Sequence, residues 1–434
     1  MAFLGMRGNG EWVTDQRPKS WREVILYRYP NGMAPLTAIL SKMASERTPD
    51  PEFNWWTKSL PTQRATITGR YTDEALATAY VSGGTSGDTL YFKMSAADVS
   101  QFKLGHGVLL RDASDITVDC VGKVTGRSAA GSSSYIKVLL LEADNNSTSH
   151  DLSDCDTALV MGTIHSEGSA MPDAIAYDPT KWYNYTQIFK TSLSLTRTAM
   201  QTKLRTGDQR KEAKREALEL HSIEMEKSFL FGVSSERTGD NGKPERTTLG
   251  IIPAIRGGYT GSGGDAGTVN DFSTNTDFAG QTWLQGGEEW LDAQLEVIFR
   301  KGSSEKLAFC GSGALLGINK LIKAGGNFDY TSATVDYGIK VTKWVTAFGL
   351  INLVTHPLFS HEVTTRNSMV IFEPKDLKYR YVQDTTFLKD INENQGGWTS
   401  RDGIDEGFLT EAGLEYHHPD GWGYLYGLNT NSAV

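Results

Sequence analysis

The amino-acid sequence predicts a mixed α+β protein, and three observations support this fold class. An alternating strand at residues 189–195 is followed by a long charged helix, which begins after Gly207 and Asp208 and ends at Gly232. Short apolar runs between Gly-, Ser- and Asp-rich turns fill residues 75–170, as in small antiparallel β modules. Helix-like and strand-like segments then alternate toward the C-terminus. The 434 residues should therefore form two or three structural units.

Composition argues against several classes of protein. The net charge is −9 and the isoelectric point about 5.5. Proteins that bind nucleic-acid phosphates are usually basic, so direct binding of nucleic acid is not expected as the main function. Three widely spaced cysteines give neither a disulfide framework nor a zinc spacing, which fits a reducing compartment. No segment approaches the ~20 apolar residues of a membrane span, and the first residues do not resemble a signal peptide.

Residues 1–60 are predicted to form an arm rather than a domain. Prolines punctuate this segment, and only residues 36–43 have an amphipathic pattern. Its many aromatic residues are unlike a disordered tail, so the arm should pack on its own body or on another subunit. Trp21, Trp55 and Trp56 are candidate intersubunit anchors, because Trp dominates interface energetics. Packing within the chain is the alternative for all three.

A long hairpin with an inserted β module is expected next. Residues 64–71 alternate between apolar and polar types, and this segment could pair with the strand at 189–195. Short apolar runs then predict strands at 89–94, 107–110, 118–125, 135–141 and 158–164. These strands predict a small barrel or sandwich at about 75–170, inserted where a hairpin tip tolerates an extra domain.

The predicted helix after Asp208 would be close to ~40 Å long. Charges of both signs crowd its surface. Its first half has only a thin apolar stripe, formed by Ala213, Ala217, Leu220 and Ile223. The helix is therefore either an ordinary solvated helix or a long structural helix that contacts neighbouring subunits.

The remaining chain is predicted to hold an α+β unit and a run of closing strands. Helices are expected at 283–301 and 312–324, and strands at 306–310, 335–346, 350–356, 369–373, 378–383 and 407–417. Residues 419–421 should form a hairpin turn after the last of these strands.

Candidate chemical groups are weak. Residues 311–313 lack the Lys-Ser/Thr of a phosphate loop and are better explained as a helix start capped by Ser312. The pairs His356/His361 and His417/His418 do not provide the shared face that a zinc site needs. The acidic loop containing Asp402, Asp405 and Glu406 has too few ligands for a calcium loop. We therefore predict no catalytic residue, no cofactor and no metal.

The order of arm, long hairpin, long helix, α+β unit and closing strands resembles the major capsid protein of tailed bacteriophages with the Hong Kong 97-type fold. Four segments are most similar to the SU10-like capsid family: APLTAILSKMASERTPDPEFNWWTKSLP, KTSLSLTRTAMQTKLRTGDQRKEAKREALELHSIEMEKSFLFG, MVIFEPKDLKYRYVQDTTFLKD and GFLTEAGLEYHHPDGWGYLYGLN. The likeness does not cover about 75–170, which would be a lineage-specific insertion.

This resemblance implies a division of the chain into five parts. They are an N-arm at 1–60, an E-loop hairpin at 61–206 with the module inserted, the spine helix of a P-domain at 207–245, an A-domain at 246–365 and the closing P-domain strands at 366–434.

The function that the resemblance implies is assembly, not catalysis. Copies would form hexamers and pentamers and close into an icosahedral shell around double-stranded DNA, without sequence-specific binding. A separate scaffolding protein, a portal and a decoration protein are the expected partners, and assembly would take place in the bacterial cytoplasm, with the protein ending in the virion. The candidate intersubunit contacts are Trp21, Trp55, Trp56, Phe189, Leu193, Leu195, Arg210, Lys211 and Arg215. The alternatives are a decoration or tail component, and a metal-dependent cytoplasmic enzyme that uses the acidic loop.

Overall fold

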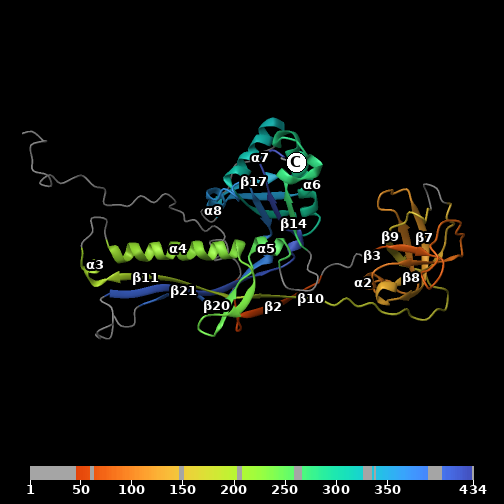
Figure 1. Cartoon of the computed structure of the whole chain (residues 1–434), viewed down its shortest axis with the longest axis horizontal. Coiled ribbons are helices and arrows are strands. Elements are labelled where there is room, and N and C mark those ends of the chain that lie inside the picture. Colours follow the sequence, from red (N-terminus) through yellow and green to blue (C-terminus); the bar gives the residue numbers. More distant parts are fainter. Residues whose placement is uncertain are drawn as a thin grey trace, which may run out of the picture. The chain divides into compact units, whose positions relative to one another are not determined.

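The computed structural model describes residues 45–58, 63–145, 151–202, 208–258, 266–325, 335–336, 339–389 and 403–432. The chain forms two compact units (Figure 1). The smaller unit is Lys58–Pro179, and the larger unit combines Met1–Thr57 with Thr180–Val434. Among the described residues, no helix is both long and apolar enough to cross a membrane.

A four-stranded sheet forms one part of the larger unit. Its strand order is β1 (Ser45–Arg47), β20 (Leu377–Leu388), β21 (Gly403–Tyr416) and β11 (Gln187–Thr196). Strands β11 and β21 are antiparallel over the whole length of β11. Helix α4 (Gln209–Phe231) lies along these strands, which confirms the predicted strand followed by a long helix (Figure 1).

Both ends of α4 are fixed by the residues that the sequence indicated. The Asp208 side chain accepts a hydrogen bond from the backbone N–H of Arg210 at 3.0 Å, which satisfies one free donor of the first turn. At the other end, the Gly232 N–H donates to the Ser228 carbonyl at 2.8 Å. A Cβ at Gly232 would lie 2.4 Å from that same oxygen, so the chain can leave the helix here only at a glycine.

The predicted apolar stripe of α4 is partly wrong. Leu220 is 55% exposed, whereas the neighbouring His221 is buried. The buried positions follow a spacing of four residues, through Ala217, His221 and Met225. A histidine can occupy this line because strand hydroxyls hydrogen-bond both of its ring nitrogens, as described below.

Two short strands connect the larger unit to the smaller one. Strand β2 (Glu52–Thr57) pairs with β10 (Thr180–Tyr185) in an antiparallel ribbon that begins at the Thr180–Thr57 pair. The chain therefore leaves the larger unit and re-enters it at neighbouring points. The expected pairing of residues 64–71 with β11 is wrong: this segment forms β3 (Arg64–Thr66) and β4 (Gly69–Tyr71) of the smaller unit, where Ala65 and Ile67 enter the core.

A seven-stranded sheet forms the other part of the larger unit. Its order is β14 (Thr268–Asp271), β22 (Gly423–Tyr426), β19 (Met369–Phe372), β15 (Glu305–Cys310), β18 (Leu350–Thr355), β17 (Ile339–Val345) and β16 (Val335–Asp336). Both faces of its central strand are buried. On β15, Ala308 and Cys310 pack with α6 (Trp283–Phe299) and α7 (Ser312–Gly325), while Leu307 and Phe309 join the core that contains the end of α4 and α5 (Ile251–Ile255).

The closing strands do not form one set. Strands β19 and β22 belong to the seven-stranded sheet, and β20 and β21 to the four-stranded sheet. The expected turn forms at Pro419–Gly421, but β21 and β22 do not pair, so the predicted hairpin is wrong. Next to this turn, His418 has a φ of 48°, in the left-handed region where the chain can change direction sharply. The chain thus crosses between the sheets twice, and the His417 N–H donates to the Asp376 carbonyl at 2.8 Å between the crossings.

The smaller unit is a seven-stranded antiparallel sheet. The strand order is β3, β9 (Thr157–Thr163), β6 (His106–Arg111), β7 (Asp119–Ser128), β8 (Tyr135–Leu140), β5 (Thr89–Lys93) and β4. All five strands expected inside the module are confirmed. Because β3 and β4 follow one another in the chain but lie at opposite ends of this order, residues 64–71 join the two edges and close the sheet into a barrel. Phe92 and Phe102 are among its fully buried core residues.

Candidate functional site

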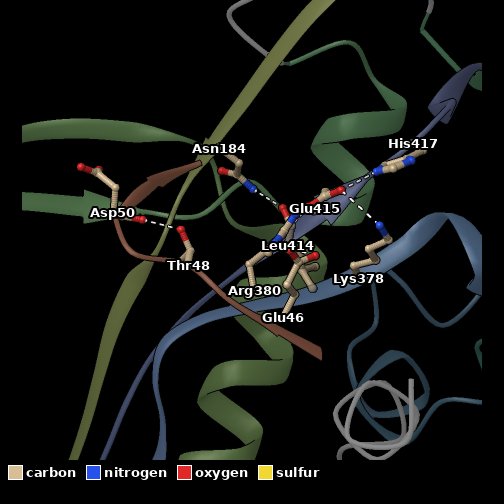
Figure 2. Close-up of polar contacts among 9 residues, drawn as sticks. All are labelled: Glu46, Thr48, Asp50, Asn184, Lys378, Arg380, Leu414, Glu415 and His417. Atoms are coloured by element: carbon tan, nitrogen blue, oxygen red, sulfur yellow. Dashed lines mark hydrogen bonds and ion pairs between the residues drawn. The ribbon is translucent and has the colours of Figure 1, made fainter. Parts of the chain in front are cut away.

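A cluster of charged side chains lies on β20 and β21, beside the first described residues (Figure 2). Arg380 hydrogen-bonds the buried Glu415 carboxylate through Nε and contacts Glu46 of β1 at 2.7 Å through Nη1. The other Glu415 oxygen lies 2.6 Å from Nε2 of His417 and 3.7 Å from Nζ of Lys378. Burial alone would raise the pKa of Glu415, but the hydrogen bonds from His417 and Arg380 outweigh it and keep that pKa below its usual value.

These contacts hold the N-terminal end of the described chain against the sheet. Strand β1 is parallel to β20, and the Thr48 N–H continues the pairing by donating to the Tyr381 carbonyl at 2.9 Å. The Thr48 hydroxyl then donates to the Asp50 carbonyl at 2.8 Å, which forms the turn into β2 (Figure 2). Ladder pairing and the Glu46–Arg380 ion pair together fix where β1 lies on the sheet edge.

Asn184 of β10 is a second fixed point, and no motif in the sequence singled it out as a functional residue. Its Nδ2 donates to the Leu414 carbonyl at 2.7 Å, and its Oδ1 accepts from the Leu249 N–H at 2.9 Å (Figure 2). The side chain is fully buried. One amide therefore connects three segments that are far apart in sequence. The available signal was its place on the inward side of a strand, two residues after the buried Trp182.

Two of the predicted contact tryptophans can now be placed. Trp55 is buried in the core of its own chain, where its ring meets Tyr416 edge-on at 5.1 Å between centroids. This burial favours packing within the chain for Trp55, which was the alternative to a role as an intersubunit anchor. Trp56 points to the other side of β2 and is 63% exposed. Trp21 lies outside the described residues.

The predicted contact residues of β11 also face their own chain. Phe189 and Leu193 are buried, and the Phe189 ring meets Phe229 of α4 edge-on at 5.9 Å. This face of the strand packs on α4, so both side chains are covered within the single chain. Leu195 is half-buried and packs against a small cluster of Leu193, Ala217 and Phe408.

On α4, the three predicted basic contacts differ in their surroundings. Arg210 forms a bidentate pair with Glu406 of β21, with nitrogen–oxygen distances of 3.2 and 2.5 Å. This pair is within the chain, and the Arg210 side chain is still 37% exposed. Lys211 and Arg215 are exposed. Glu406 itself is only 1% exposed, so it does not belong to a solvated acidic loop; Asp402 lies outside the described residues.

The buried histidines join elements rather than form a reactive centre. His221 of α4 lies 3.0 Å from the Thr191 hydroxyl of β11 and 2.8 Å from the Thr410 hydroxyl of β21, and burial lowers its pKa. His356, after β18, lies 2.8 Å from the buried Glu226 of α4. No group of three or more metal-ligating side chains occurs among the residues that the structure describes.

Comparison with known proteins gives one family over almost the whole chain. The family model described as the SU10 major capsid protein matches residues 10–429. The major capsid protein of Pseudomonas phage PaMx41 is 25% identical over 424 residues, which are 94% of this chain and 92% of that protein.

Solved structures give a distant likeness. The capsid of cyanophage P-SCSP1u is 11% identical with a TM-score of 0.38, covering 62% of this chain and 80% of the other. The capsid of a native GTA particle gives 10% identity and a TM-score of 0.40, with the same coverage. From the family match, we conclude that the chain belongs to the SU10 major capsid protein family and is a major capsid protein of a tailed phage.

Proposed function

We propose that many copies of this chain assemble through hexamers and pentamers into the icosahedral head shell of a tailed phage with a double-stranded DNA genome. The subunit would have the Hong Kong 97-type arrangement of N-arm, E-loop, P-domain and A-domain. Two findings support this proposal: the family membership, and a long helix that lies along a sheet built from β11 and the distant β20 and β21. Contacts between different surfaces on neighbouring copies would close the shell.

In this proposal, residues 1–60 are the N-arm and 61–206 are the E-loop. Residues 207–245 contain the spine helix, 246–365 form the A-domain, and 366–434 supply the closing strands. The β module is an insertion in the E-loop. The compactness of Lys58–Pro179, together with the pairing of the flanking residues Thr57 and Thr180, supports the insertion.

The expected partners follow from this role. A separate scaffolding protein would guide closure, a portal would occupy one vertex, and a decoration protein would bind the outside. Assembly would take place in the host cytoplasm. The net charge of −9 suits a lining that does not hold DNA tightly. Trp56, Leu195, Lys211 and Arg215 remain contact candidates, because each is exposed or half-buried in the single chain.

A catalytic role is not proposed. The side chains that an enzyme would need are already engaged in holding the fold, since Glu406 pairs with Arg210 and His356 with Glu226. No observation specifically favours a tail or decoration component.

The observation that carries the proposal is the attachment of α4 to the sheet. Arg210, His221 and Phe229 each bind or pack on a strand, so the helix and the sheet form one stiff plate along which neighbours can be arranged. The test is the size of the purified protein, by light scattering and negative-stain electron microscopy, with and without the scaffolding protein. We expect shells, tubes or free capsomers. A protein that stays monomeric at every concentration and with scaffold would overturn the proposal.

A further inference from the structure

The outer face of the β2–β10 ribbon carries one exposed aromatic residue, Trp56, and two half-buried ones, Tyr183 and Tyr185. Trp56 pairs directly with Lys181, and Asn54 with Tyr183, so these four side chains share the face opposite the core. Tyr185 continues the row, and its ring meets Tyr183 edge-on at 5.7 Å between centroids. Trp and Tyr are the residues that most often dominate binding energy at protein interfaces. Here they lie on a surface rather than in the core.

A groove begins next to this face, at Thr186, which directly follows Tyr185. The groove has a volume of about 440 Å³ and lies between the start of β11 and the hairpin of β12 (Ser235–Thr238) and β13 (Pro244–Thr247). Ile188, 54% exposed, supplies an apolar side chain to its wall. Tyr185 connects the two features, because it pairs with Glu52 on the ribbon and directly precedes Thr186, which lines the groove.

The β12–β13 hairpin has little of its own to hold it in place. Every side chain of β12 is exposed, and two cross-strand ion pairs are its main side-chain contacts: Glu236 with Arg246 at 3.0 Å and Arg237 with Glu245 at 2.9 Å. Isolated two-stranded hairpins are marginally stable in water, and exposed ion pairs add little. A partner bound in the groove would cover one face of the hairpin and stabilise it.

The charges around this surface indicate what kind of partner fits. Lys181, Lys243 and Arg246 are balanced by Glu52, Asp240, Glu245 and Glu411. A nearly neutral surface does not attract nucleic acid, which needs excess positive charge. It does allow a second molecule with a net charge of −9 to approach without strong repulsion.

We infer that the outer face of the β2–β10 ribbon, together with the groove beside the β12–β13 hairpin, is a docking surface for a second copy of this chain. The inference rests on the proposed function, because copies must contact one another to form a shell. Trp56 and Tyr183 are the anchors, and Ile188 is the apolar contact within the groove. Only the outer face of the ribbon is open to this contact, because its inner face is already filled within its own chain.

Assembly of full-length variants tests the anchors. The double variant Trp56→Ala with Tyr183→Ala should raise the protein concentration required for particle formation by about tenfold or more. The double variant Trp56→Phe with Tyr183→Phe keeps an aromatic ring at both positions, so it should need a concentration close to that of the parent. Leu284→Ala is the matched control, because Leu284 is also exposed (58%) but lies on α6, away from this surface. The thermal midpoint of the unassembled double-alanine variant should stay close to that of the parent. An unchanged assembly concentration for that variant would overturn the inference.

Photo-crosslinking identifies the occupant. A benzoylphenylalanine replaces Asn54 at the centre of the face, and equal amounts of ¹⁴N- and ¹⁵N-labelled full-length chains are assembled together. Crosslinked peptides with mixed labels are expected, because they can arise only between copies. Crosslinks confined to one label, or directed to the scaffolding protein, would contradict the inference. If the parent protein forms no particles at all, the proposed function fails instead, so the two failures are distinguishable.

Discussion

The two compact units bury their residues in different ways. The hydrophobic core of the β module is apolar, and three of its six strand pairings, β4–β5, β6–β7 and β7–β8, join strands that follow one another in sequence. Among the described residues, the module buries His106 and Asp144, whereas the larger unit buries seven Glu, Lys and His side chains: His221, Glu226, Lys306, His356, Glu373, Glu406 and Glu415. Its key polar contacts join residues about 200 positions apart, as with Arg210–Glu406 and Asn184–Leu414.

This difference has a physical reason. Strands that follow one another, such as β6, β7 and β8 of the module, are brought into register by their turns together with their apolar alternation. Strands from remote parts of the chain have no such guide. A buried polar pair fixes their register, because a shifted strand would leave the pair unsatisfied at considerable cost. The strand register of the larger unit is therefore defined more strictly, but the stability of this unit is more sensitive to single substitutions.

The largest effect is expected at Lys306. Its ammonium group is fully buried and donates to Glu373 Oε1 at 2.5 Å, and to the carbonyls of Lys301 and Gly421 at 3.1 and 3.0 Å. Lys306→Met leaves the carboxylate of Glu373 buried without its cation and should lower the free energy of unfolding by about 3–5 kcal/mol, measured by urea unfolding of the unassembled chain.

Lys301 provides the matched control for this substitution. It pairs with Asp420 at 2.9 Å, but its side chain is 54% exposed. Lys301→Met should therefore cost less than about 1 kcal/mol. Equal losses for the two variants would show that burial of the charge is not what matters.

A smaller loss is expected at Asn184. Asn184→Ala leaves the N–H of Leu249 and the carbonyl of Leu414 without their side-chain partner, and should cost about 2–3 kcal/mol in unfolding free energy. Asn54→Ala, on the exposed side of the same ribbon, should change it by less than about 0.5 kcal/mol. If Asn184→Ala were as mild as Asn54→Ala, buried polar contacts would not hold the larger unit together.

The next effect depends on pH. Burial lowers the pKa of His221 below the value of about 6.5 that it has in the unfolded chain. Above that value the ring is neutral in both states. As pH falls below it, the unfolded chain binds the proton more readily, so the unfolding free energy should decrease.

His221→Gln removes this dependence, and the difference between parent and variant between pH 7.5 and 5 isolates it. His361→Gln, at an exposed histidine, is the control. A parent and a His221→Gln variant with parallel pH curves would rule out this histidine as the source.

The smallest effect on the larger unit is expected from removing the module. Because Thr57 and Thr180 are a directly paired couple, an Asn-Gly turn can join them in place of residues 58–179. The shortened chain should be soluble and keep the hydrogen-exchange protection of α4 and β21. Loss of protection in β21 would mean that the module stabilises the larger unit, and the contrast between the two units would have to be abandoned.

Sequence patterns predicted local elements well and long-range partners poorly. The limits of β11, α4 and the five module strands follow from alternation, caps and turn residues, all of which are local. The pairing of 64–71 was mispredicted because alternation shows that a strand has a buried face but not which sheet buries it. The two crossings that divide the closing strands between the sheets, one of them beside the left-handed residue His418, are not revealed by any periodicity.

For the candidate site, residue type was informative but orientation was not. Trp55 and Trp56 are adjacent and chemically identical, yet one is buried and the other exposed. Only the register of β2 against β10 decides between them. Asn184, Arg380 and Glu415 escaped notice because a polar residue in a strand is ordinarily assigned to the solvent side.

The double crossing between the two sheets of the larger unit also has a mechanical consequence. Residues 373–377 and 416–423 run side by side from one sheet to the other, and the His417–Asp376 hydrogen bond connects them. A force that pulls the two sheets apart is therefore carried by two backbone segments at once, and separating the sheets means stretching covalent chain as well as breaking hydrogen bonds. In a shell that holds a tightly packed genome, tension along the wall would be shared at this point in every subunit.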